Sequence, residues 1–223
     1  RYVVSKGIDE WKDQSYVLWG LSQECLSRTI FPMGQYHKDD IKQMAIDRGY
    51  EELAKKPESY EICFIPDNDY RGFLKRKVEG LEEQVKGGNF INTKGEVIGT
   101  HDGYPFYTIG QRKLGVSFGL EASYVIEIKP ETNEVVVGSK EDLNKQEMVV
   151  KGLNYIKYDS IPDNFESLTK VRYKHQGEQS TLTNMDKEIK VLFHKKVEGI
   201  APGQSAVFYE GNDVLGGGFI AKQ

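Results

Sequence analysis

The sequence predicts an α+β protein of several small domains, with the tail end of an α/β unit first, a small mixed domain next and an all-β barrel last. Three observations predict this class: helical apolar spacing near the start, Gly-rich aromatic and β-branched texture over residues 86–119, and short strand-like runs after Tyr124. A chain of 223 residues is long enough for two or three such domains. We place them at residues 1–70, 71–140 and 141–223.

Two helices are expected in the first part. Apolar residues from Asp13 to about Arg28 follow the period of an amphipathic helix, and a second helix is expected from Asp39 to about Arg48, with Gly49 as its stop. A short apolar run, Glu61–Ile65, is bounded by a proline and reads as a buried strand. With only one further short strand near Tyr2–Val4, these pieces cannot form a covered sheet, so this α/β unit looks truncated.

The strand signals concentrate in the second half. After a helical turn or two at Tyr70–Lys77 and the Gly-rich module, Tyr124–Ile128 and Glu134–Gly138 flank a turn and predict a hairpin. The run Gly216–Gly218 lacks the context of a phosphate-binding loop, so we interpret it as a close-packed strand or a bulge. The barrel strands are expected at Met148–Tyr158, Leu168–His175, Gln179–Asn184, Glu188–Phe193, Ser205–Tyr209 and Val214–Ala221.

Composition limits the function classes. The net charge is -4, so nucleic-acid binding would need a local basic track, and each basic cluster taken alone is more often a solvated face. No apolar run reaches the length of a membrane helix and no signal peptide is evident, which favours the cytoplasm. Two cysteines are too few for a disulfide scaffold or a four-ligand zinc site, so no metal is expected. The four scattered histidines give no support to hydrolytic catalysis.

The two cysteines have different surroundings. Cys25 follows Leu18 and Leu21 at helical spacing, which predicts a core position. Cys63 lies in an apolar run that suits a small buried side chain, but the run ends at once and four cationic side chains follow within about two helical turns. Because cations favour the reactive thiolate, both a packing role and a chemical role stay open for Cys63.

Four stretches together resemble the tRNA-specific 2-thiouridylases, which place sulfur on the wobble uridine. They are KDQSYVLWGLSQECLSRTIFPMG from Lys12, ICFIPDNDYRGFL around Cys63, GEVIGTHDGYPFYTIGQRKLG in the middle and PGQSAVFYEGNDVLGGGFI near the end. The match runs in order along essentially the whole chain. The resemblance implies that residues 1–70 are the C-terminal part of an α/β nucleotide-binding catalytic domain and that residues 71–140 contact tRNA.

The resemblance also implies a chemistry. ATP, with Mg²⁺, would adenylate the uridine, and a persulfide on Cys63, loaded by a sulfur-donor protein, would supply sulfur. The family's Ser-Gly-Gly-x-Asp-Ser loop for ATP and its first catalytic cysteine do not occur in this sequence, so we expect the chain alone to be inactive. Contact with tRNA is implied for Lys12, Asp13, Gln14, Arg172, Tyr173 and Gln204.

Plainer roles exist for several of these residues. Asp13 could cap a helix, Tyr173 could pack in a strand, and Gln204 could satisfy a turn. Because side chains alternate along a regular strand, Arg172 and Tyr173 can both touch RNA only near a bend, a bulge or a strand end. Two other functions are considered: an RNA-binding module without catalysis, and a small redox protein that uses Cys25 and Cys63, whose Cα atoms must then lie within about 7 Å.

Overall fold

The computed structural model describes residues 1–57, 64–65, 67–114 and 122–222. The chain divides into two compact units. One unit joins the first residues, Arg1–Lys56, to the last, Lys145–Gln223, and the other is the intervening Pro57–Asn144. The α+β class, with a small mixed module and a C-terminal barrel, is confirmed.

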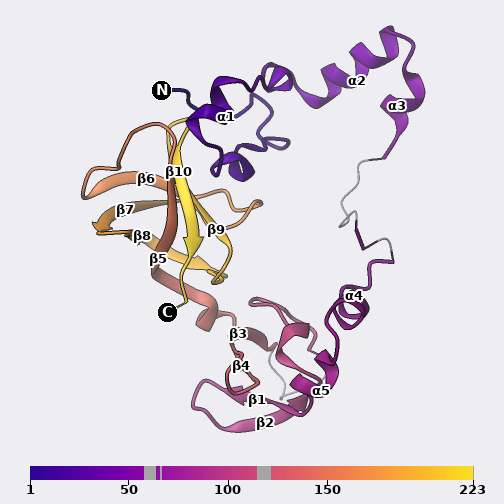
Figure 1. The fold of residues 1–223 in the computed structure, drawn as a ribbon, viewed down its shortest axis with the longest axis vertical. Coiled ribbons are helices and arrows are strands. Elements are labelled where there is room, and N and C mark those ends of the chain that lie inside the picture. The colour runs from indigo at the N-terminus through magenta and orange to yellow at the C-terminus, as the bar shows by residue number, and fades with distance from the viewer. Residues whose placement is uncertain (58–63, 66, 115–121, 223) are drawn as a thin grey trace. The chain divides into compact units, whose positions relative to one another are not determined.

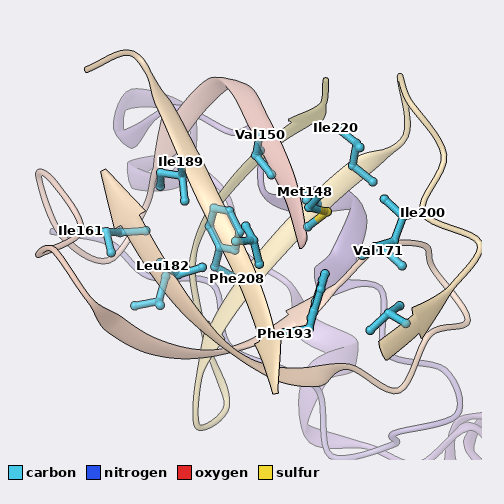
Figure 2. Packing of buried hydrophobic residues seen from close by; sticks show 14 residues of the cluster. Met148, Val150, Ile161, Val171, Leu182, Ile189, Phe193, Ile200, Phe208 and Ile220 are labelled. Carbon is cyan, nitrogen blue, oxygen red and sulfur yellow. The ribbon is translucent and has the colours of Figure 1, made fainter. Parts of the chain in front are cut away.

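The last part of the chain is a closed barrel with strand order β10-β5-β8-β7-β6-β9 (Figure 1). Its strands are β5 (Asn144–Tyr155), β6 (Phe165–Lys170), β7 (Glu178–Met185), β8 (Glu188–Glu198), β9 (Ser205–Glu210) and β10 (Asp213–Ile220). Figure 2 shows the apolar side chains that fill its interior, among them Met148, Phe193 and Phe208. All six predicted strands form, although β5 begins earlier and β6 ends earlier than the sequence indicates.

The first residues cover part of the outer surface of this barrel. In β9, Ala206 and Phe208 point into the barrel, whereas Val207 and Tyr209 belong to a second cluster that also contains Trp19. Successive strand residues face opposite sides, so residues 206–209 of β9 are all buried because the N-terminal segment covers its outer face. The start of the chain therefore forms an outer layer over β9 and the residues beside it.

The long helix predicted from Asp13 to Arg28 is wrong. The segment forms a 3-10 turn η1 (Ser15–Leu18), a break at Gly20 and then α1 (Gln23–Ser27). The carbonyl oxygens of Trp19 and Leu21 accept hydrogen bonds from Asn154 Nδ2, at 2.6 and 3.1 Å, so neither continues a helical ladder. The Ser22 side chain caps the new helix instead, accepting from the backbone N–H of Cys25.

This break also overturns the predicted core position of Cys25, which is exposed. The side chain that α1 buries is Leu26. The apolar stripe with Leu18 and Leu21 does not exist because Leu18 lies in η1 and Leu21 lies between η1 and α1, so neither shares a helix with Cys25. In the short helix, the residue next to Cys25 therefore occupies the packed position.

The rest of the first segment contains η2 (Pro32–Gln35), α2 (Lys38–Asp47) and α3 (Glu51–Lys55). The second predicted helix is confirmed as α2, and Gly49 follows it with φ 82°, a left-handed conformation that ends helices readily. The strand expected at Tyr2–Val4 is wrong: only Ser5 forms an isolated bridge, with Asp213, and Val4 accepts from the N–H of Val214.

The middle unit is a four-stranded sheet with order β2-β1-β4-β3, in which β1 and β4 are parallel. Its elements are α4 (Tyr70–Lys77), α5 (Leu81–Val85), β1 (Gly88–Asn92), β2 (Val97–His101), η3 (Tyr104–Phe106), β3 (Tyr124–Lys129), β4 (Glu134–Gly138) and η4 (Glu141–Leu143). The predicted hairpin is confirmed as β3–β4. Its core includes Phe90, Phe106 and Val125.

The predicted strand Glu61–Ile65 lies mostly outside the described residues. Phe64 is in a turn and the buried Ile65 is not in a strand, so the end of that prediction is wrong. Cys63 is outside the described residues, and so is the separation between Cys25 and Cys63. Within the described part of the chain, no helix is long and apolar enough to cross a membrane.

Candidate nucleic-acid interface

A carboxylate organises the loop that carries the first motif. Asp13 Oδ1 accepts hydrogen bonds from the backbone N–H groups of Gly7 and Ser15, at 3.0 and 3.3 Å, and Oδ2 accepts from Ser15 Oγ at 2.7 Å. Asp13 thus ties both ends of the loop together. Its two oxygens are engaged within the protein, which favours a positioning role over direct contact with a polyanion.

Ser15 links this loop to the barrel. Its hydroxyl lies 3.1 Å from the Tyr209 hydroxyl in a buried contact. A serine hydroxyl has one proton, and that proton goes to Asp13, so Tyr209 must donate to Ser15. Burial raises the pKa of Tyr209 to about 12, so its phenol remains protonated and can donate at physiological pH.

Gln14 lies against a residue from the opposite end of the sequence. Its Nε2 donates to the hydroxyl of Tyr173 at 2.7 Å. The Tyr173 ring is 38% exposed and lies 6.3 Å from the ring of Tyr16, whose hydroxyl donates to the carbonyl of Ser205 at 2.8 Å. Three motifs predicted to touch RNA, those containing Gln14, Tyr173 and the residues around Ser205, therefore meet at one surface.

Arg172 and Gln204 complete this surface. β6 ends at Lys170, so Arg172 and Tyr173 lie in the turn after it and strand alternation does not separate them. The predicted strand Leu168–His175 is therefore too long. Arg172 is exposed, and its Nη1 donates to the Glu198 carbonyl at 2.6 Å.

Gln204 is exposed on a loop, and both its backbone N–H and its backbone carbonyl form hydrogen bonds. Its N–H donates to the Ala201 carbonyl and its carbonyl accepts from the Ile220 N–H. Lys12 is half-buried in the turn just before Asp13, and its backbone N–H donates to the Asp9 carbonyl at 3.1 Å. We call the set Gln14, Arg172, Tyr173 and Gln204, with Lys12 at the adjoining turn, the Gln14–Tyr173 surface.

The electrostatics around Arg172 are positive. Its charge helps to lower the pKa of His175, for which burial is the main cause and Lys170 a further one. Burial raises the pKa of Tyr16 to about 12, although the bond to Ser205 and the charge of Arg172 oppose this rise. Tyr16 and Tyr209 therefore remain neutral donors, while the cation of Arg172 is exposed.

Sequence reasoning missed the residues beneath this surface. Ser15 and Tyr209 have no distinguishing sequence pattern, and Tyr16 fitted an apolar helix stripe. The hydrogen bond of Tyr16 to Ser205 spans most of the chain, so only the fold reveals it. The described residues contain no group of three or more His, Cys, Asp or Glu side chains that could hold a metal ion.

Three family models match the chain in order and define a class of tRNA-modifying enzyme. They are the tRNA methyl transferase HUP domain at residues 1–67, the tRNA methyl transferase PRC-barrel domain at residues 72–139, and the aminomethyltransferase beta-barrel domain at residues 145–220. The HUP model matches where the sequence predicts part of an α/β nucleotide-binding domain.

The similar proteins share one name within that class. A tRNA-specific 2-thiouridylase MnmA of Cytophaga hutchinsonii is 57% identical over 99% of this chain, and those of Amoebophilus asiaticus and Salinibacter ruber are 55% and 50% identical. The chain belongs to the tRNA-specific 2-thiouridylase family. It spans about three-fifths of the length of these relatives, namely 60%, 59% and 58%.

Proposed function

We propose that the protein acts in the cytoplasm to transfer sulfur to C2 of the wobble uridine, position 34, of tRNA, and that the Gln14–Tyr173 surface binds that tRNA. One observation carries the binding proposal: motifs about 160 residues apart converge, joined by the 2.7 Å bond between Gln14 and Tyr173. The names of the similar proteins, 2-thiouridylases, support the reaction.

Each side chain of the surface suits a different part of RNA. Arg172 and Lys12 can neutralise phosphates, and the exposed ring of Tyr173 can stack on a base or a sugar. Gln14 and Gln204 carry both donors and acceptors for base edges. Asp13, with both oxygens engaged internally, would hold the loop of Lys12 and Gln14 in the shape that RNA meets.

The chemistry is assigned to Cys63. The uridine C2 oxygen would attack the α-phosphate of ATP, which releases pyrophosphate and leaves an adenylated oxygen. The terminal sulfur of a Cys63 persulfide, loaded by a donor protein, would then attack C2. A second thiolate would attack Cys63 Sγ, forming a disulfide and leaving sulfur on C2 as AMP departs; external reduction of the disulfide resets the enzyme.

ATP and Mg²⁺ require a binding loop that these 223 residues do not contain. The described residues have no glycine-rich phosphate loop between a strand and a helix, and Gly216–Gly218 lie within β10. We therefore expect the chain alone to release no pyrophosphate from ATP. Release by the purified chain would contradict this assignment.

The decisive experiment is thiolation of a tRNA transcript by the whole enzyme with ATP and a persulfide donor. Cys63→Ser should abolish 2-thiouridine formation and leave tRNA affinity nearly unchanged, because it removes the sulfur carrier and no cation. Cys25→Ser is the matched control and should retain activity. Thiolation by Cys63→Ser would refute its role, and tRNA binding without thiolation by the unmodified enzyme would favour an RNA-binding module without catalysis.

A further inference from the structure

Two lysines from distant parts of the chain converge on one buried tyrosine. Lys6 Nζ lies 4.7 Å from the centroid of the Tyr209 ring, and Lys170 Nζ lies 5.4 Å from the same centroid. Tyr209 is fully buried, and its hydroxyl is bonded to Ser15 beneath the loop of the first motif. The two ammonium groups are therefore fixed beside the Gln14–Tyr173 surface.

The backbone around both lysines is well anchored. The N–H of Lys6 donates to the Asn212 carbonyl at 2.8 Å, which attaches it to the turn between β9 and β10. Lys170 is the last residue of β6 and pairs with Val207 of β9. Arg172, the exposed cation of the surface, follows two residues later.

Nearby carboxylates offset the positive charge of this pair only in part. Among the described residues, neither ammonium forms an ion pair with a carboxylate, and the ring of Tyr209 offers only its π face because its phenol stays protonated. The pKa of Lys6 is lowered by burial and by Lys170, which together outweigh the attraction of Asp13 and Glu10. A bound anion would relieve this repulsion.

We propose that Lys6 and Lys170 bind a phosphate of the tRNA backbone next to the Gln14–Tyr173 surface. The proposal rests on the proposed function, because it adds two phosphate ligands to the same RNA-binding face. Lysine is suited to this task as a compact cation with three donors. Both residues position the tRNA and take no part in the chemical step.

The first test measures binding of a tRNA transcript to the 223-residue chain as a function of salt. Lys6→Gln and Lys170→Gln should each reduce the magnitude of the slope of log K against log salt by about 0.9 or less. At 0.1 M salt, a slope change of this size corresponds to a loss of up to about eightfold in affinity. Lys187→Gln is the matched control. Lys187 is an exposed lysine at the other end of β7, about 25 Å along the strand from the Lys170 end.

The second test needs no RNA. Reductive methylation of the lysines, read by mass spectrometry, is compared with and without inorganic tripolyphosphate. Lys6 and Lys170 should be protected and Lys187 should not. Protection together with no tRNA binding by the unmodified chain would support the phosphate pair and refute the proposed function. The proposed phosphate site would be overturned if Lys6 and Lys170 were methylated equally with and without tripolyphosphate. It would also be overturned if the salt slopes of Lys6→Gln and Lys170→Gln equalled that of Lys187→Gln.

Discussion

A methyl group at Gly217 should destabilise the barrel unit. A Cβ built there would lie 2.6 Å from the carbonyl oxygen of Ala206 on β9 and 3.0 Å from two ring atoms of Trp19. The Ala206 oxygen belongs to a paired strand and Trp19 is buried, so neither can move away freely. Overpacking of this kind costs about 1–3 kcal/mol, and in a chain of this size each kcal/mol shifts Tm by about 2–4 °C.

The expected fall in Tm for Gly217→Ala is therefore about 2–12 °C, measured by circular dichroism and by tryptophan fluorescence. Trp19 should report the strain directly because it contacts the new methyl. Gly20→Ala is the matched control: its Cβ would meet nothing within 4 Å, so its stability should stay within about 0.5 kcal/mol of the unmodified chain. Equal Tm values for the two variants would refute the close packing of β10 against Trp19.

Three further predictions concern titratable groups. Exposed Cys25 should react with iodoacetamide in the native protein, and labelling only after unfolding would restore the core interpretation. Burial lowers the pKa of His101, so the folded state binds its proton less readily than the unfolded chain, and stability should fall as pH drops through about 6.5. His101→Gln should show a smaller decline, with the remainder due to His175, whose pKa is also lowered by burial. A pH profile of stability identical to that of the unmodified protein would contradict the role of His101. Lys157 forms ion pairs with Glu210 and Asp213, so Lys157→Met should lower the urea midpoint more at pH 7 than in acid below the lowered pKa values of both carboxyls, where they are protonated; an equal loss at the two pH values would exclude the charge contribution.

The barrel was predictable because its signals are local. Turn residues separate its strands and apolar residues alternate within them, so all six strands could be expected from short windows of sequence. Helix α2 was predictable for the same reason, because its end depends on a single local residue, Gly49, in the left-handed conformation. The main misplaced boundaries were those of β5 and β6 and the end of β8, which runs to Glu198 where the sequence indicated Phe193.

The failures have a common cause in long-range contacts. No residue between Asp13 and Arg28 indicates that Asn154 donates hydrogen bonds to the carbonyl groups of Trp19 and Leu21. The continuous helix was therefore predicted wrongly, and so was the core position of Cys25 that depended on it. The separate motifs of the candidate surface were predictable from the sequence, but their meeting at one surface was not. Its supporting residues, Tyr209 above all, contribute through contacts that no local pattern encodes.

The joining of the chain's two ends has a consequence for its synthesis. Val4 accepts a hydrogen bond from the N–H of Val214, so the first segment cannot complete its packing until nearly the whole chain has been made. At about 5–20 residues per second, the apolar side of that segment, including Trp19, waits on the order of ten to forty seconds for β10. During this interval it is open to chaperones and to wrong partners, so newborn chains should be far more prone to aggregate than finished ones.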